Sequence, residues 1–509
     1  MRRLAPLLIL TFILRIVLAF RSDANIGTKG FNDDSFYIHT VSYHLGIGNG
    51  MTIDGKQLTN GLQPLVALLY APCYSIAAPD KWLGLRLTFI IIALIDCCSV
   101  TLLYFFLRRY APRSPGRNIS PAFIGSLSFI FLNPIISQTT NGMETGLATL
   151  LLLLSLYCYS LLLESDSDSS VKLSALLGIS LGLLVLARID AVILVALVVG
   201  YEWYRQRSFR IPVIVGSIAV LISLPWWLYN YIYFGSLLPT SGASEMLGGP
   251  SLIENLIRLG VTLSDISIFV ASLRFDTVSH ILKVLWIALG YAIIALVWKH
   301  RKSVVQTIPL PMQSAIGITV VFGALLALWY SAFFHASYFL PRYLMPLRMA
   351  MLLFYSFLLP VFWREVSKQW QIGVSIGLVF GIVFSLSLYV NNFFLMKPNE
   401  LYEMGLWAQQ HPSETIGMQQ SGVAGFVADN IVNLDGKVNA DVLAAMKKKE
   451  RGAYIASAPI TIIADWKEFA EVLRAEAKAA GANFEPIDSI GLVTIYKRTG
   501  LTNPAASRK

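Results

Sequence analysis

The chain has 509 residues, of which 55% are hydrophobic and 14% are charged, against about 25% charged residues in an ordinary soluble domain. This composition, with a mean hydropathy of +0.62, excludes a disordered chain, a disulfide scaffold and a normal cytosolic enzyme, and it predicts a polytopic membrane protein. The net charge of +10 does not indicate nucleic-acid binding, because residues 1–397 carry 28 Lys and Arg against 17 Asp and Glu, whereas residues 398–509 carry 12 against 13.

Apolar runs long enough to cross a bilayer, about 20 residues each, recur along the first three quarters of the chain. A shorter apolar run at 63–78 contains Pro64 and ends beside Pro79, and we expect it to form a re-entrant or surface-lying helix. The predicted fold class is an α-helical polytopic membrane protein with about 11 transmembrane helices. They are expected near 4–20, 85–107, 119–137, 145–163, 173–187, 189–204, 211–231, 281–298, 314–334, 343–362 and 371–391.

Basic residues in the connecting segments predict which side each segment faces. Counting 63–78 as a full span would place the basic segment 108–117 outside, against the rule that positive residues stay in the cytoplasm. The first span resembles a signal peptide, but Arg15 interrupts it and no small-residue cleavage site follows, so we expect it to remain uncleaved. The sequence therefore predicts a multi-pass protein of the plasma (inner) membrane with a cytoplasmic N-terminus and an extracytoplasmic C-terminus.

Two large segments are expected on the outer side, the loop 21–84 and the tail 398–509. The predicted organisation is a transmembrane domain at 1–397, which includes this loop, and a small α/β domain at 398–509. In the tail, an amphipathic pattern predicts a helix at 465–480. Strand-like runs lie at 415–422, 452–457, 460–464 and 491–498.

The first outer loop carries the cluster that points most directly to chemistry. Asp33 and Asp34 are adjacent, and Tyr37 and His39 follow shortly after them. A carboxylate at the membrane surface can act as a general base for a hydroxyl group, or it can hold a divalent cation that bridges to a phosphate. The alternative is structural, with Asp33 or Asp34 at the start of a surface helix at 35–46.

Further polar residues lie at outer ends of the predicted spans, where ionisable groups are costly and often functional. Each has a structural alternative: turn chemistry, a carboxylate at a helix start, an arginine that reaches the interface, or aromatic anchoring. Arg188 and Asp190 are two positions apart, so their spacing does not by itself predict a salt bridge. Asp96 is the acidic residue that lies clearly inside a span. The candidate substrate-binding residues, besides Tyr37 and His39, are Asn60, Gln63, Glu144, Arg188, Asp190, His335, Arg342 and Tyr343.

The order of these motifs resembles the polytopic GT-C glycosyltransferases that use polyprenyl-phosphate sugars. That group includes protein O-mannosyltransferases, aminoarabinose transferases and mycobacterial arabinofuranosyltransferases. An acidic pair after the first span is followed by G-x-Q-P-L, N-G-M-E-T, A-R-x-D and F-G-S-x-x-P motifs and by an L-D-G-x-V-N signature in the tail. In this chain they stand at 33–34, 61–65, 141–145, 187–190, 234–239 and 434–439.

The resemblance implies an inverting transfer of a sugar from a polyprenyl-phosphate donor to an extracytoplasmic glycan, lipid or protein. It implies that Asp34, favoured over Asp33, is the general base, and that Arg188 and Arg342 contact the phosphate. One departure is Glu245, which stands where we associate a lysine with the loop after the F-G-S-x-x-P motif.

No metal ligand set and no cofactor is predicted. The acidic pair without an obvious third carboxylate favours a metal-free mechanism, and a divalent cation, Mg²⁺ or Mn²⁺, stays open. The competing functions are a transporter or flippase of lipid-linked sugars and a non-catalytic glycan-binding membrane protein.

Overall fold

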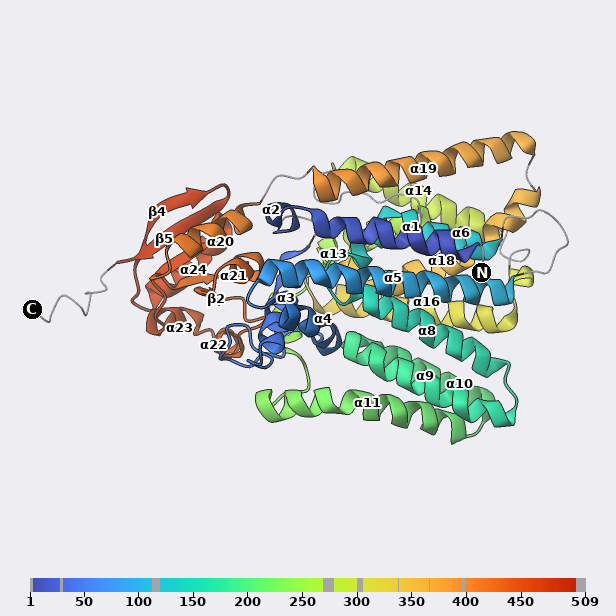
Figure 1. Cartoon of the computed structure of the whole chain (residues 1–509), viewed down its shortest axis with the longest axis horizontal. Coiled ribbons are helices and arrows are strands. Elements are labelled where there is room, and N and C mark those ends of the chain that lie inside the picture. The colour runs from blue at the N-terminus through green and yellow to red at the C-terminus, as the bar shows by residue number, and fades with distance from the viewer. Residues whose placement is uncertain are drawn as a thin grey trace, which may run out of the picture. The chain divides into compact units, whose positions relative to one another are not determined.

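The structure is a computed structural model that describes residues 3–27, 31–111, 120–268, 279–299, 305–336, 338–365, 367–395 and 399–499. Most of the predicted cytoplasmic segment 108–117 and the ends of the predicted tail domain lie outside these residues. The chain forms two compact units (Figure 1). The helical unit consists of Met1–Phe20, Phe89–Trp227 and Gly248–Asn392, and the loop–tail unit consists of Arg21–Thr88, Leu228–Leu247 and Phe393–Lys509.

The helical unit is built from long apolar helices. Within it, α8 packs against α9 and α16, and α18 packs against α16 and α6. Its helices, including those that extend beyond its bounds, are α1 (Leu4–Ile16), η1 (Val17–Phe20), α5 (Lys81–Tyr110), α6 (Pro121–Phe131), α7 (Asn133–Thr139), α8 (Thr145–Leu163), α9 (Ser167–Ala187), η3 (Ile189–Ala191), α10 (Val192–Gln206), α11 (Arg210–Phe234), α13 (Leu252–Ile268), α14 (His280–Lys299), α16 (Leu310–Phe333), α17 (Leu340–Tyr343), α18 (Met345–Glu365) and α19 (Lys368–Phe394).

Six of the described helices are long and apolar enough to cross a membrane, or seven if the bent pair α6 and α7 counts as one span. The predicted α-helical polytopic membrane fold is confirmed. The number of 11 spans stays a prediction, because several of the expected spans form shorter apolar helices. These include Leu4–Phe20, His280–Ala295 and Met345–Pro360, and the 63–78 run also forms a short helix, Pro64–Ala77.

The expected span at 119–137 is broken into two helices that meet at 64°. Pro134 lies at the start of α7, and a proline has no N–H to donate to the carbonyl four positions back, with which its ring also clashes. Arg15 satisfies carbonyls near the break, donating to Ile130 at 3.1 Å and to Phe129 at 3.4 Å. Its Nε also binds Asp96 Oδ2 at 2.7 Å, with both side chains fully buried. The break is therefore held by a buried ion pair.

Small residues let two of the membrane helices approach closely. A Cβ added at Gly178 or Gly182 of α9 would lie 2.9 Å from the carbonyl oxygens of Val215 and Ala219, respectively, on α11. The two glycines are four positions apart on one face, the spacing that allows close helix packing in membranes.

The loop–tail unit begins with two short helices from the first loop, α3 (Asp33–Gly46) and α4 (Pro64–Ala77), which pack together. Asn32 is the N-cap position of α3, and Asp33 and Asp34 lie in its first turn. A helix thus begins at this acidic pair, as the structural alternative expected, but its N-cap position is Asn32 and not an aspartate. The unit also contains two shorter helices, α2 (Asp23–Asn25) and α12 (Thr240–Leu247).

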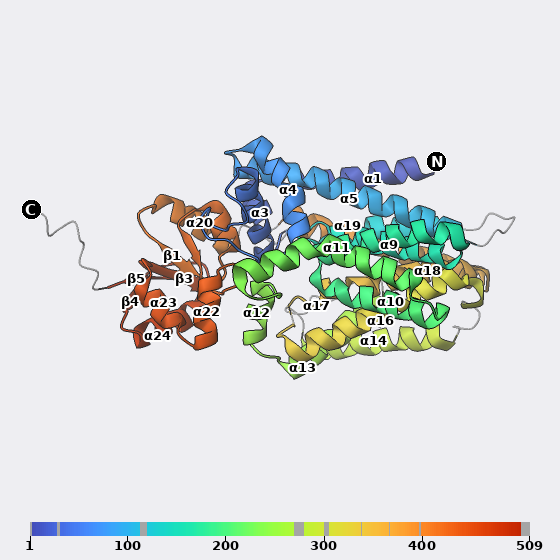
Figure 2. The same cartoon turned by 90° about the horizontal axis from the view of Figure 1, so that it is seen from below.

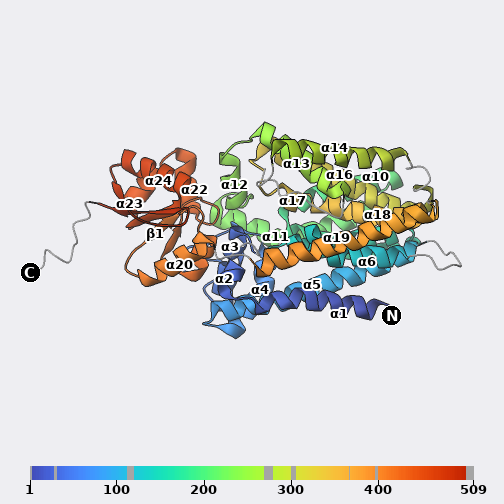
Figure 3. The same ribbon diagram turned by 90° about the horizontal axis from the view of Figure 1, so that it is seen from above.

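The tail forms a five-stranded sheet with the strand order β2-β1-β3-β5-β4. β1 pairs in parallel with β2 and β3, whereas β5 pairs antiparallel with β3 and β4. Helix α20 lies on one face and α22–α24 lie on the other (Figure 2, Figure 3). The elements are α20 (Glu400–Gln410), β1 (Ile416–Met418), α21 (Gly422–Val427), β2 (Ile431–Asn433), α22 (Ala440–Lys448), α23 (Arg451–Ser457), β3 (Ile462–Trp466), α24 (Lys467–Ala479), β4 (Phe484–Ile490) and β5 (Val493–Arg498).

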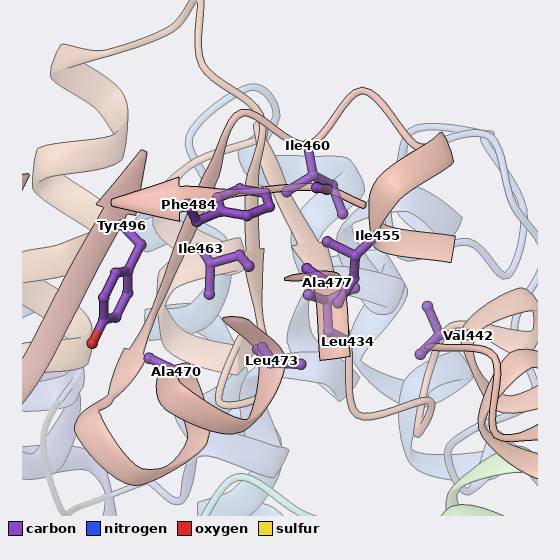
Figure 4. Packing of buried hydrophobic residues seen from close by; sticks show 11 residues of the cluster. Leu434, Val442, Ile455, Ile460, Ile463, Ala470, Leu473, Ala477, Phe484 and Tyr496 are labelled. Carbon is purple, nitrogen blue, oxygen red and sulfur yellow. The ribbon is translucent and has the colours of Figure 1, made fainter. Parts of the chain in front are cut away.

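The sheet buries a hydrophobic core against α22, α23 and α24. Ile463, Phe484 and Tyr496 come from the strands, and Leu473 and Ala477 come from α24 (Figure 4). The predicted small α/β fold of the tail and its helix near 465–480 are therefore confirmed.

The strand predicted at 452–457 is wrong, because these residues form helix α23. All six residues are small or apolar, so neither a two-residue nor a helical period stands out. Tertiary contacts favour the helix. Gly452 lets α23 approach α24 closely, since an added Cβ would lie 2.1 Å from the Glu476 carbonyl oxygen. Arg451 then pairs with the Glu476 carboxylate at 2.7 Å.

Candidate functional site

Asp33 anchors a helix of the tail within the loop–tail unit. Its Oδ1 accepts a hydrogen bond from the Val423 N–H at 2.8 Å, and its Oδ2 accepts one from the Gly422 N–H at 3.0 Å. These residues begin α21, where N–H groups have no partner inside the helix. Burial raises the pKa of Asp33 to about 6, and the two backbone hydrogen bonds oppose that rise. Both carboxylate oxygens of Asp33 thus bind a helix N-terminus.

Asp34 faces a cation instead. Lys437 Nζ lies 3.1 Å from Asp34 Oδ1 and 2.8 Å from Glu245 Oε1. The Asp34 side chain is 28% exposed, so a hydroxyl group can reach it from solvent. The Glu245 that departs from the expected lysine is therefore paired with a lysine that comes from the tail.

Tyr37 makes hydrogen bonds and His39 makes ring contacts within the same unit. The Tyr37 hydroxyl lies 3.1 Å from Ser421 Oγ and accepts a hydrogen bond from Asn433 Nδ2 at 3.1 Å. The His39 ring is fully buried and stacks between two aromatic rings, Phe31 and Tyr70. Burial lowers the pKa of His39 to about 3, so the ring is neutral at physiological pH. A substrate contact by either residue stays a prediction.

The two further candidates from the first loop, Asn60 and Gln63, lie beside α12 and at the start of α4, respectively. Asn60 is buried, and its Oδ1 accepts a hydrogen bond from the Thr240 N–H at 3.2 Å. Gln63 is half-buried and occupies the N-cap position of α4, with Pro64 as the first helical residue. Asn60 therefore ties the first loop to the segment that carries Glu245.

A second polar cluster lies in the helical unit, around Arg188. This residue ends α9 in an extended conformation, with φ −153° and ψ 111°, and the 3₁₀ turn η3 follows. The bend lets Arg188 Nε donate to Asp190 Oδ1 at 3.1 Å, a salt bridge that the two-residue spacing did not predict. On the other side, Arg188 Nη1 lies 3.6 Å from Glu144 Oε1.

The Tyr343 ring lies between two guanidinium groups of this cluster. The Arg188 Cζ is 4.1 Å from its centroid and the Arg342 Cζ is 5.2 Å from it. Arg342 Nη1 also contacts Met143 Sδ. Tyr330, which the sequence did not single out, donates from its hydroxyl to Asp190 Oδ2 at 3.0 Å. Two arginines and two carboxylates are thus held around one tyrosine.

Three residues of this cluster, Arg188, Asp190 and Arg342, line a small cavity in the helical unit. Its polar residues include Arg188, Asp190 and Arg342, and most of its remaining lining is apolar. Apolar pockets with a few polar groups are the common form of small-molecule sites. The apolar part of the lining includes Ala148, Leu152, Leu184, Ala191, Phe322, Met345 and Pro346.

His335 is not among the residues that line this cavity. Its side chain is 41% exposed, and its Nε2 lies 3.6 Å from Glu254 Oε2. Within the described part of the chain, no three His, Cys, Asp or Glu side chains are grouped as a metal ion would require.

Sequence reasoning did not select Lys437 or Tyr330 as site residues. Lys437 lies inside the 434–439 motif, so a signal was present for it. Tyr330 lies in an apolar span with no motif, and its contacts with Asp190 and Tyr343 reveal it.

Comparison with known proteins supports the fold. The structure is similar to crystal structures of ArnT from Cupriavidus metallidurans, with a TM-score of 0.58 for the form bound to undecaprenyl phosphate and 0.54 for the apo form. The bound form is 11% identical, covering 98% of this chain and 97% of that one, and the apo form is 10% identical, covering 91% and 92%.

A curated relative is similar in sequence over part of the chain. The terminal β-(1→2)-arabinofuranosyltransferase of Mycobacterium tuberculosis is 24% identical over 236 residues, which is 44% of this chain. The match spans 36% of that relative's own length. No family model matches the chain. The fold shared with these structures is the polytopic GT-C membrane fold.

Proposed function

We propose that the protein is a glycosyltransferase that moves a sugar from a polyprenyl-phosphate donor to an extracytoplasmic glycan, lipid or protein. The GT-C fold, the sequence similarity to an arabinofuranosyltransferase and the ArnT complex with undecaprenyl phosphate support the reaction class and the donor. The observation that carries the proposal is the different environment of the two adjacent carboxylates. Asp33 binds a helix N-terminus, whereas Asp34 is partly exposed beside Lys437.

In this mechanism Asp34 accepts the proton of the acceptor hydroxyl group. The acceptor oxygen then attacks the anomeric carbon from the face opposite the phosphate, and the bond between that carbon and the phosphate oxygen breaks. The electron pair of that bond stays on the departing polyprenyl phosphate, and the configuration at carbon inverts. Guanidinium groups bind phosphate through paired N–H donors, which assigns phosphate contact to Arg188 and Arg342.

The same proposal places the protein in the plasma (inner) membrane with the N-terminus in the cytoplasm and the tail outside. A membrane-borne donor suits chemistry on the outer face, because soluble sugar nucleotides are cytoplasmic. The structure does not favour a transporter, since the intramembrane Asp96 is bound by Arg15 and accepts from Thr139 at 2.8 Å.

Replacing each carboxylate in turn tests the base assignment. Asp34→Asn should lower kcat by about 10²–10⁴-fold, the usual contribution of a general base, with donor binding and thermal stability retained. Asp33→Asn should mainly lower stability, because it weakens the N-terminal contact of α21. The measurement is release of polyprenyl phosphate from a panel of radiolabelled polyprenyl-phosphate sugars.

Asp54→Asn is the matched control, since Asp54 is an exposed aspartate of the same loop whose side chain binds local backbone N–H groups. Normal turnover by the Asp34→Asn protein would overturn the base assignment. No turnover and no binding with any donor by the wild type would overturn the proposed function.

A further inference from the structure

Lys437 links three segments that are far apart in the sequence. Its ammonium group bridges Asp34 of the first loop and Glu245 of α12, at 3.1 and 2.8 Å. The side chain is 15% exposed, so the ammonium group is largely shielded from water. An ion pair in such surroundings is screened much less than one at the open surface.

The backbone of Lys437 is held by a tight turn. The Gly436 N–H donates to Asn433 Oδ1 at 3.1 Å, and the Lys437 N–H donates to Asp435 Oδ1 at 2.8 Å. Gly436 has a φ of +75°, a conformation in which a residue with a side chain is strained. This turn fixes the direction in which the Lys437 side chain leaves the tail.

Residues of α12 and of the first loop also hold this turn in place. The Lys437 carbonyl oxygen accepts a hydrogen bond from Thr240 Oγ1 at 2.7 Å, and the Asp435 carbonyl oxygen accepts one from Ser244 Oγ at 2.5 Å. On the first loop, a Cβ added at Gly61 would lie 1.8 Å from the Lys437 carbonyl oxygen. The backbone that carries the ammonium group is thus fixed against both segments that supply its carboxylate partners.

We infer that Lys437 is a positioning residue for Asp34, which makes the tail a part of the catalytic centre. The inference rests on the proposed function, in which Asp34 is the base. The ammonium group favours the ionised carboxylate and fixes its orientation through the contact with Asp34 Oδ1. Glu245 holds the ammonium group from its other side.

The charged groups around Asp34 agree with this role. Asp33, Asp435 and Glu245 are neighbouring carboxyls, which together disfavour another negative charge. Burial raises the pKa of Asp33 and of Asp435 to about 6, and the Lys437 charge opposes the rise for both. Lys437 therefore offsets repulsion within a group of acidic side chains.

The test compares Lys437→Met, which keeps the length of the side chain and removes its charge, with Lys437→Arg, which keeps the charge. Lys437→Met should lower kcat by about 10–100-fold, which is less than the loss of the base itself. It should also move the acid limb of the pH–rate profile to higher pH, because no cation then favours the charged base. Lys437→Arg should leave that limb at its wild-type position.

Two controls separate positioning from stability. Lys448→Met makes the same change at an exposed lysine of α22 and should match the wild type. Glu245→Gln removes the second partner of Lys437 but keeps the cation beside Asp34, so its acid limb should not move upward. A purely structural tether would lower thermal stability without moving the limb.

A wild-type rate and pH profile for Lys437→Met, while Asp34→Asn is inactive, would overturn the inference and leave the proposed function standing. A wild type that is inactive with every donor would instead count against the proposed function. Should Lys437→Met not fold, the double variant Lys437→Gln/Glu245→Gln removes both ends of that ion pair and gives the same readout. An unmoved acid limb in the folded double variant would equally overturn the inference.

Discussion

At the residue scale, two adjacent aspartates differ in the contacts that they make. Asp33 and Asp34 have the same side chain at adjacent positions, yet one binds the N-terminus of α21 and the other contacts Lys437. The residues that make this difference, Val423 and Lys437, lie about 400 positions away in the chain. The acidic pair could be selected from the sequence as a candidate, but the division of roles depends on long-range contacts that no local pattern encodes.

Arg342 supports a prediction at the same scale. Removing one charge-assisted contact costs about 1.5–3 kcal/mol, so under the proposed function Arg342→Ala should weaken binding of a polyprenyl phosphate by roughly 10–100-fold. Arg342→Lys should give an intermediate loss, because an ammonium group keeps the charge without the paired donors. The measurement is the dissociation constant in detergent micelles.

Arg108→Ala is the control for this prediction, since Arg108 is an exposed arginine in the last turn of a helix in the same unit. Equal affinities for the Arg342→Ala and Arg108→Ala proteins would show that Arg342 does not contact the phosphate.

At the scale of elements, hydropathy predicted most of the membrane helices but not how they break. The run at 119–137 has one continuous apolar signal, and its 64° bend depends on Pro134 and on carbonyl groups that Arg15 satisfies from another helix. The error at 452–457 has a related cause, since packing against α24 makes a short apolar run helical. In both cases the local backbone structure depends on contacts with a residue of another helix.

The Arg15–Asp96 pair gives a prediction for these elements. Asp96→Asn leaves a buried guanidinium without its counter-ion, which should lower the free energy of unfolding by about 3–5 kcal/mol. Glu164→Gln is the matched control, because the Arg109–Glu164 pair is 46% and 33% exposed and such pairs contribute about 1 kcal/mol or less. Thermal unfolding in detergent compares them. Equal midpoints for the two variants would show that the buried pair does not stabilise the break.

At the scale of the whole molecule, the packing units do not follow the order of the chain. The loop–tail unit combines the first loop, α12 and the tail, three stretches separated by membrane helices. Composition predicted a membrane protein, local patterns predicted an α/β tail, and motif order predicted the GT-C fold. The sequence could not predict which segments pack together, because contacts such as those of Asp33 with Val423 and of Lys437 with Glu245 join residues that are far apart in the chain.

The loop–tail unit also contains three carboxyls whose protonation is coupled to folding. Burial raises the pKa of Asp33, Asp435 and Asp465 from 3.8 to about 6. A carboxyl whose pKa is higher in the folded state binds its proton more tightly there, so its stabilising contribution is complete below pH about 4 and is lost as the pH rises through about 6. Glu414 acts in the opposite sense, because its hydrogen bond to Lys497 lowers its pKa.

We therefore expect the stability of this unit to fall between pH 4 and pH 6, with Asp465→Asn showing a shallower fall. Asp465 is fully buried in β3 and accepts hydrogen bonds from the N–H groups of Gln419 and Gln420, so the neutral amide removes one coupled titration while keeping an acceptor. Hydrogen exchange of the tail strands across this pH range, corrected for intrinsic exchange rates, measures the effect. Glu485→Gln, at an exposed position of β4, should leave the slope unchanged. Equal slopes for Asp465→Asn and the wild type would mean that this carboxyl is equally easy to protonate in the folded and unfolded states.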